Sequence, residues 1–135
     1  MAGAHFWASV ENKDSRVRLK GVYDLDEKRI EAAVERGRKN GVEIVGYSSR
    51  KELLCDPDID IVCVATTNEV HAEICIDALR HSKHVICEKP VCLGSGELQD
   101  IIDVAIETGK LFTTHQNRRW DTDFLMTRTC LPGRA

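Results

Sequence analysis

The fold of this chain is decided by residues 59–87, which read IDIVCVATTNEVHAEICIDALRHSKHVIC. The stretch opens with an apolar run at residues 59–65 that only Asp60 interrupts, which is typical of a strand buried on both faces of a parallel sheet. A helix follows, because one apolar stripe recurs at helical spacing: His71, Ile74, Cys75, Ala78 and Leu79. Residues 84–87 form a second apolar run. A strand, a helix and a strand in this order predict a right-handed parallel crossover.

The same alternation continues on both sides of this stretch. Further strands are predicted at residues 17–23, 42–47 and 111–114. A helix is predicted from an N-cap at Asp26 to Gly41, and a short one from a capping box of Ser49 and Glu52. The last helix begins at a Ser95 cap, ends at Gly109 and buries four residues: Leu98, Ile101, Ile102 and Ala105. The pattern predicts an α/β, Rossmann-like, doubly wound parallel sheet with helices on both faces.

Length and composition limit the classes of protein. At 135 residues the chain has room for one domain, and 42% hydrophobic with 30% charged residues is typical of a globular protein. The net charge of −3 disfavours a nucleic-acid partner, which requires a basic face. No apolar run is long enough for a membrane span, and residues 1–7 lack the features of a secretory signal. We therefore expect a cytoplasmic protein without nucleic-acid or membrane partners.

The six cysteines contain no C-x-x-C pair, so neither a metal site nor a redox motif is expected. Cys63 and Cys87 lie inside apolar runs, where free cysteine usually acts as a small buried hydrophobe. An α/β redox or metal protein built on the cysteines is therefore disfavoured.

Three motifs occur in a family-specific order. They are Cys87-Glu88-Lys89-Pro90, Ala65-Thr66-Thr67-Asn68 followed by His71, and His115-Gln116-Asn117-Arg118-Arg119-Trp120. Together they resemble the N-terminal half of the Gfo/Idh/MocA oxidoreductases, over residues 2 to about 125. The resemblance implies an NAD cofactor, with NADP also compatible, and hydride transfer on a sugar or polyol in the intact enzyme. It also implies that intact relatives are homo-oligomers.

The resemblance assigns roles to particular residues. Lys89 is the expected catalytic residue, which polarises or protonates the substrate oxygen. The expected cofactor-binding residues are Ala2, Asp24, Thr66, Thr67, Asn68, His71, Glu88, Lys89, Gln116 and Asn117. In open parallel sheets such residues gather beyond the carboxyl ends of the strands, and an acid there binds the ribose hydroxyls and favours NAD.

Alternatives remain for several of these residues. Asp24 could be a turn residue that caps the next helix, and Lys89 could be an ordinary surface lysine. His71 could be a hydrogen-bonded core histidine as readily as a cofactor contact. Thr67 stands where the family usually has proline. Lys28 and Arg29 lie close enough in sequence to Asp24 to leave NADP open.

The two ends of the chain also carry expectations. The start matches only the tail of a G-x-G-x-x-G loop, with Ala2 at the third glycine position. Residues 1–125 are therefore expected to be a partial NAD(P)-binding Rossmann domain without its first, central strand and without the C-terminal substrate domain. Residues 126–135 are expected to be an unrelated or frayed tail. Such a chain is expected to be inactive alone and to have weak tertiary structure; the alternative function is a non-catalytic nucleotide-binding or interaction module.

Overall fold

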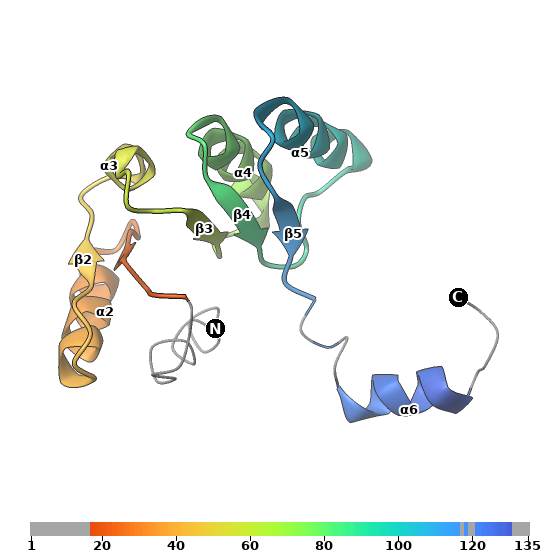
Figure 1. The fold of residues 1–135 in the computed structure, drawn as a ribbon, viewed down its shortest axis with the longest axis horizontal. Helices are drawn as coiled ribbons and strands as arrows, with labels where there is room; N and C mark the ends of the chain where they lie inside the picture. Colours follow the sequence, from red (N-terminus) through yellow and green to blue (C-terminus); the bar gives the residue numbers. More distant parts are fainter. Residues whose placement is uncertain (1–16, 117, 119–120, 131–135) are drawn as a thin grey trace.

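The computed structural model of the chain describes residues 17–116, 118 and 121–130 (Figure 1). The predictions for Ala2 and Asn117 lie outside these residues. The described elements are, in order, β1 (Gly21–Val22), α2 (Glu27–Lys39), β2 (Val45–Gly46), α3 (Arg50–Cys55), β3 (Ile61–Val64), the 3₁₀ turn η1 (Asn68–Val70), α4 (His71–Arg80), β4 (His84–Cys87), α5 (Ser95–Thr108), β5 (Phe112–Thr114) and α6 (Thr122–Cys130). Strands and helices alternate up to β5, as predicted.

All described strands pair in parallel, in two groups. β1 pairs with β2, and β3, β4 and β5 form a three-stranded sheet in that order. Among the described residues, no strand hydrogen-bonds to both groups and so joins them into one sheet. Helices α4 and α5 lie side by side over one face of the three-stranded sheet, whereas α6 lies apart from the sheets (Figure 1). The parallel α/β fold is confirmed.

The largest core cluster lies between α4, α5 and the three-stranded sheet. Four of the five members of the predicted stripe of α4 are buried, namely His71, Cys75, Ala78 and Leu79, and the fifth, Ile74, is half-buried and packs against the same cluster. Val85 and Cys87 of β4 pack against it from the sheet. The buried side chains are almost completely removed from water, so the hydrophobic effect fixes α4 on the sheet.

The predicted buried face of α5 is partly wrong. Ile101 and Val104 are buried, but Leu98 and Ile102 remain 37% and 38% exposed. The reason is that α5 packs mainly against α4, which leaves its outer flank partly open to solvent; Ile102 lies there, at a hollow between α5 and β5. The helix does end at Gly109, which takes φ +65°, a left-handed conformation that glycine adopts without steric cost.

The predicted burial of the cysteines is half right. Cys87 is buried, but Cys63 of β3 is exposed, as is Ile61 two residues earlier. Side chains alternate between the two faces of a strand, and α4 and α5 cover only the face that carries Val64. All six cysteines are free thiols.

The helix caps follow the sequence with two corrections. The Asp26 side chain accepts a hydrogen bond from the Lys28 N–H, and the Ser49 hydroxyl accepts one from the Glu52 N–H. Glu52 does not complete the capping box at Ser49, because its carboxylate accepts from the N–H and hydroxyl of Ser48 instead. Ser95 does not cap α5: the N-cap is Gly94, without a side-chain hydrogen bond.

Polar contacts around residues 56–58 connect the two groups of strands. Just after β2, the buried Tyr47 donates its hydroxyl to Asp56 Oδ2 at 2.5 Å. Lys20, before β1, donates to Asp58 Oδ2 at 2.9 Å. The nearly buried Lys83, before β4, donates to the Asp56 carbonyl at 2.7 Å. The turn before β3 therefore joins β1, β2 and β4 in one network.

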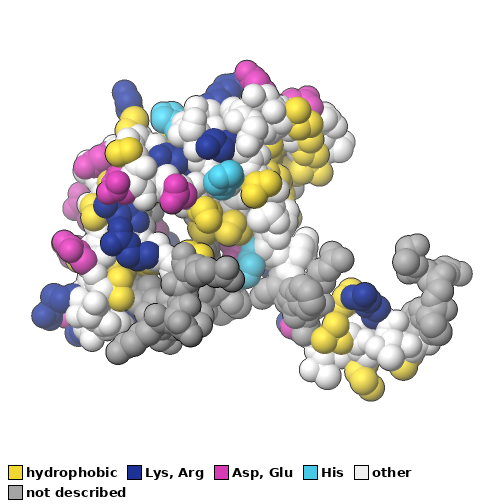
Figure 2. All heavy atoms as spheres, in the orientation of Figure 1, with side chains coloured by type: hydrophobic (Ala, Val, Ile, Leu, Met, Phe, Trp, Pro, Cys, Tyr) yellow, Lys and Arg dark blue, Asp and Glu magenta, His cyan; other side chains and the backbone are white. Residues whose placement is uncertain are grey.

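Figure 2 shows Lys and Arg side chains interspersed with Asp and Glu over the visible face. This mixture agrees with the small net charge of −3. Within the described residues, no helix is both long and apolar enough to cross a membrane.

The Tyr47–Asp56 contact generates a pH-dependent prediction. Burial, together with the hydrogen bond to Asp56, raises the pKa of Tyr47 to about 12 from its ordinary value of 10.0. The folded state favours the neutral phenol, so this stabilisation is complete below pH 10 and is lost as the pH rises to about 12. We expect Tyr47→Phe to lower the unfolding free energy by about 1–3 kcal/mol at neutral pH and to abolish this part of the alkaline decline.

The measurement is urea denaturation at several alkaline pH values, with tyrosinate absorbance recorded in parallel. Tyr23 is the only other tyrosine, so Tyr23→Phe is the matched control and should retain the decline. Equal alkaline decline in Tyr47→Phe and the wild-type chain would contradict the assignment.

Candidate functional site

Polar side chains follow the carboxyl ends of four strands. Asp24 follows β1, Thr66 follows β3, Lys89 follows β4 and His115 follows β5. Because the strands of each group are parallel, their carboxyl ends lie at the same edge, where ligands of open α/β sheets bind. The structure therefore places described members of the predicted site at carboxyl strand ends.

Asp24 is fixed by the turn into α2. Its Oδ1 accepts a hydrogen bond from the Asp26 N–H at 3.0 Å, and its Oδ2 lies 3.5 Å from Nη1 of Arg29. The side chain of Asp24 remains 37% exposed. The predicted helix-capping role belongs to Asp26, which leaves the Asp24 carboxylate partly open to a ligand.

The loop after β3 presents Thr66, Thr67 and Asn68. Thr66 and Thr67 are exposed, and Asn68 begins η1. The Glu69 carboxylate accepts hydrogen bonds from its own N–H and from the Thr67 hydroxyl, and these hold its pKa below the ordinary value. The Glu69 carboxylate is therefore hydrogen-bonded within this loop, next to the first turn of α4.

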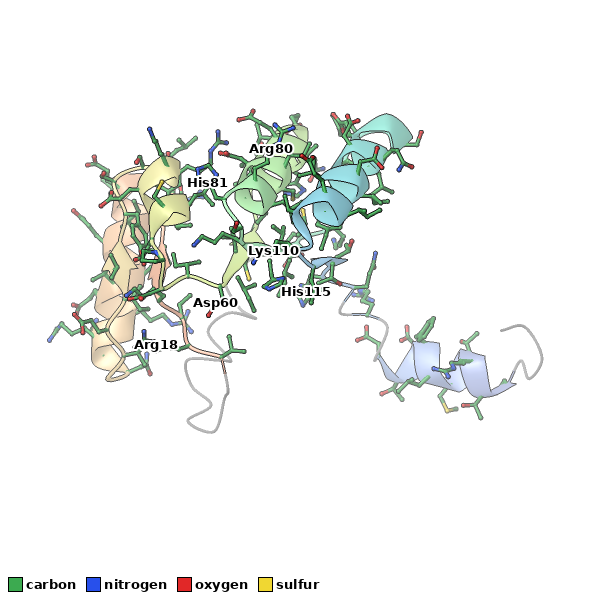
Figure 3. The ribbon with its side chains drawn as sticks, turned by 45° about the horizontal axis from the view of Figure 1, so that its top comes forward. Arg18, Asp60, Arg80, His81, Lys110 and His115 are labelled. Carbon is green, nitrogen blue, oxygen red and sulfur yellow. The ribbon has the colours of Figure 1, made fainter. Side chains whose placement is uncertain are left out.

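The turn after β4 is tied to the neighbouring strand end by a side-chain pair. His115 Nδ1 donates to Glu88 Oε1 at 2.9 Å, and both side chains are mostly buried, at 28% and 19% exposed. The backbone is paired there as well, because the Glu88 N–H donates to the Val64 carbonyl and the His115 N–H donates to the Cys87 carbonyl. The exposed Lys89 follows, joined to Pro90 by a cis peptide bond. Figure 3 labels His115 beside the sheet.

His71 connects this turn to the loop after β3. The side chain is 1% exposed, with Nδ1 2.9 Å from the Pro90 carbonyl oxygen and Nε2 3.1 Å from that of Thr66. The neutral ring donates one of these hydrogen bonds, and the protonated ring donates both. Between the two sequence alternatives, this geometry favours the hydrogen-bonded core histidine, which holds two loops of the candidate site together.

Two pairings were not predicted from the sequence. The Glu88–His115 hydrogen bond joins residues 27 positions apart, and its only sequence signal is that both residues follow neighbouring strands. For the Arg29–Asp24 ion pair the sequence offered a weaker signal, namely a basic residue in the first turn of the helix that follows Asp24. Gln116, which was predicted, is exposed, and its N–H donates to the Thr114 carbonyl.

Two surface hollows lie elsewhere in the described part of the chain. One, of about 300 Å³, is lined by residues around the start of α6, including Arg118, Asp121 and Phe124. The other, of about 220 Å³, lies between α5 and β5. Neither contains a predicted site residue, so the assignment of the site relies on the strand ends.

The comparisons with known proteins indicate one family of oxidoreductases. The family model GFO_IDH_MocA, described as "Oxidoreductase family, NAD-binding Rossmann fold", matches residues 1–116. The chain is 34% identical over 110 residues to an uncharacterised oxidoreductase of Schizosaccharomyces pombe, covering 82% of this chain and 30% of that protein. It is 27% identical over 132 residues to inositol 2-dehydrogenase of Salmonella typhimurium, covering 97% and 38%.

Solved structures agree with this result. An NAD-binding protein from Listeria innocua superposes with a TM-score of 0.77 at 38% identity, over 91% of this chain and 35% of that one. A putative oxidoreductase from Klebsiella pneumoniae also gives 0.77, at 29% identity over 95% and 35%. The chain thus spans about a third of the length of the relatives it matches.

The contacts of His71 generate the prediction for this site. We expect His71→Phe to lower the unfolding free energy by about 1–3 kcal/mol, because the ring N–H that donates to a carbonyl oxygen of these two loops is lost from a buried position. Amide hydrogen exchange should accelerate in residues 66–70 and 88–92, the two loops that the ring connects.

Urea denaturation and hydrogen exchange measure these effects. The control is His81→Ala, because the His81 side chain contacts Asp77 within α4 and lies at the other end of that helix. If both loops are as well protected from hydrogen exchange in His71→Phe as in the wild-type chain, His71 does not hold the two loops together.

Proposed function

The chain belongs to the Gfo/Idh/MocA oxidoreductase family, and we propose that it forms the NAD(P)-binding part of an enzyme that transfers hydride to or from a sugar or polyol. The observation that carries the proposal is the position of Asp24, Thr66 and Lys89 at the carboxyl ends of parallel strands. Relatives support the substrate class by their names, which include inositol 2-dehydrogenase and 1,5-anhydro-D-fructose reductase.

The chemistry of these residues fits a dinucleotide. A carboxylate has about four acceptor positions, so Asp24 can accept from ribose hydroxyls while it keeps its bond to the Asp26 N–H. The exposed Thr66 and Thr67 would contact the cofactor between Asp24 and Lys89. Gln116, after β5, would lie toward the nicotinamide end. Ala2 and Asn117 stay predictions for cofactor contacts, since they lie outside the described residues.

Lys89 is proposed to handle the proton of the reaction. When bound, the nicotinamide supplies or accepts the hydride. In the direction of reduction, Lys89 Nζ donates a proton to the substrate carbonyl oxygen as the neighbouring carbon gains hydride, and the proton returns to Nζ in oxidation. Glu88 would keep the turn in place through His115, because their hydrogen bond fixes the residue before Lys89. His71 would do the same from the other side, at Pro90.

The first prediction concerns cofactor binding by a protein that carries this chain within the full length of its relatives, with the first strand and glycine loop of the family in place. We expect NADH to bind more tightly than NADPH, because the Asp24 carboxylate accepts from the ribose hydroxyls and repels a 2′-phosphate. Asp24→Ala should weaken NADH binding about tenfold and narrow or reverse the preference. Nucleotide fluorescence titration measures both affinities, with Asp100→Ala on α5 as the control. Affinities for both nucleotides that are unchanged in Asp24→Ala would remove the ribose assignment.

The second prediction concerns the chemical step. It is measured in a protein of the relatives' full length that contains this chain, because the chain spans about a third of that length, with NAD and a panel that includes myo-inositol. Lys89→Met is similar in length and carries no proton, so we expect kcat to fall by about 10²-fold or more. NADH affinity should change by less than about threefold, because cofactor binding is spread over other residues.

Lys51→Met, on the exposed surface of α3, is the matched control and should leave both quantities unchanged. Near-normal kcat in Lys89→Met would make the lysine structural. In the full-length protein, NADH binding without turnover across a broad polyol panel would contradict the enzyme proposal and favour a nucleotide-binding module.

A further inference from the structure

Two of the six cysteines lie in contact inside the core. Cys75 is on the buried stripe of α4, and Cys87 ends β4 on the face of the sheet that α4 covers (Figure 1). Both side chains are 0% exposed. Their thiols share a hydrogen bond, in which the Cys75 S–H donates to the Cys87 sulfur. Two thiols in contact can be joined by oxidation, whereas an isolated buried thiol has no partner for a disulfide.

The hydrogen bond makes the two sulfur atoms unequal. It lowers the pKa of Cys87, because the Cys75 S–H stabilises the Cys87 thiolate, and it raises the pKa of Cys75. The thiolate is the form of cysteine that attacks an oxidant, so Cys87 is the nucleophile of the pair. Cys75 is then placed as the resolving thiol, the second sulfur that redox-sensing cysteines often have beside them.

The turn after β4 covers this pair of thiols. Val91 packs against the same core cluster, and the half-buried Cys92 is near enough to add to the rise in the Cys75 pKa that Cys87 causes. The turn is held at Pro90, whose carbonyl oxygen lies 2.9 Å from Nδ1 of His71, one helical turn before Cys75. Local opening of residues 88–92 would therefore admit a small oxidant to the pair while α4 and β4 stay folded.

We propose that Cys75 and Cys87 form a redox-sensitive modification site, at which hydrogen peroxide that enters when residues 88–92 open joins α4 to the end of β4 by a disulfide. The Cys87 thiolate attacks one peroxide oxygen. An S–O bond forms as the O–O bond breaks, and the departing hydroxide takes a proton from solvent to become water.

The second step closes the disulfide. The Cys75 sulfur attacks the Cys87 sulfur, so that the S–S bond forms, the S–O bond breaks and the oxygen leaves as water with the Cys75 proton. Two thiols are thereby oxidised by two electrons, and one hydrogen peroxide is reduced to two waters. A thiol reductant reverses the modification, because it attacks the disulfide and restores both cysteines.

The position of the disulfide gives it a consequence outside the core. Cys87 directly precedes Glu88 and Lys89, so the bond would fix to α4 the strand end from which that turn leaves. The inference concerns the two sulfur atoms and their cover, and it does not depend on the proposed function.

The experiment treats a protein of the relatives' full length that contains this chain with hydrogen peroxide, alkylates the remaining thiols and maps the disulfides by mass spectrometry. Cleavage after lysine and arginine, and then after glutamate, places Cys75, Cys87 and Cys92 on different peptides. We expect the Cys75–Cys87 link to exceed every other intramolecular pair within this chain by about threefold or more, and dithiothreitol to reverse it. The same treatment in urea should remove this excess, because the contact exists only in the folded protein.

Variants test the pair and its cover separately. Cys75→Ala should abolish the link, and Cys55→Ala, at the exposed end of α3, is the matched control that should retain it. His71→Phe should accelerate formation of the link about three- to tenfold, because the imidazole that holds the turn at Pro90 and the loop at Thr66 is lost.

Three outcomes overturn the inference. If circular dichroism shows the protein folded and its exposed cysteines are oxidised without a Cys75–Cys87 link, the pair is an inert part of the core. If the link forms in equal amounts with and without urea, the pairing is statistical and does not come from the folded contact. If its rate of formation is unchanged in His71→Phe, the turn after β4 does not control access to the pair.

Discussion

The parallel hydrogen bonding of β3, β4 and β5 is the constraint on which the candidate site depends. The register pairs Val64 with Cys87 and Cys87 with Thr114, so the three strands end at the same level. Pairing continues one residue further, where the Glu88 and His115 N–H groups donate to the neighbouring strands. Side chains distant in sequence therefore leave the sheet in one row, and a shift of one residue would turn them toward the other face.

The local sequence pattern predicted which helices and strands form better than it predicted where each of them begins and ends. The strand at residues 84–87 has the predicted bounds, and α4 has the predicted stripe, because periodicity and caps act within a few residues. The strands expected at 17–23 and 42–47 contain only two residues each, Gly21–Val22 and Val45–Gly46. Strand length depends on pairing partners, and among the described residues these two strands pair only with each other. The exposure of Cys63 has a similar origin, since the sequence does not reveal which face the helices cover.

The site could be predicted as a set of positions but not as a set of contacts. Strand ends and a family resemblance identified Asp24, Thr66 and Lys89. The Glu88–His115 bond required knowledge that β4 and β5 are neighbours in register, which no single-sequence pattern contains. For His71, the sequence left a core histidine and a cofactor contact equally open, and the positions of two carbonyl groups favour the first. Polar contacts between distant segments are set by tertiary geometry, so they were the part that the sequence could not supply.

The two ends of the proposed cofactor site belong to different groups of strands. Asp24 follows β1, whereas Lys89 follows β4, and these strands do not pair with each other. Their relative placement depends on the turn at residues 56–58, where Tyr47 and Lys20 from one group meet Asp56 and Asp58 before the other. The buried Lys83 holds the same turn from the β4 side. Within the described residues, this turn therefore connects the strand before Asp24 with the strand before Lys89, the two ends of the proposed cofactor site, although its side-chain contacts involve neither residue.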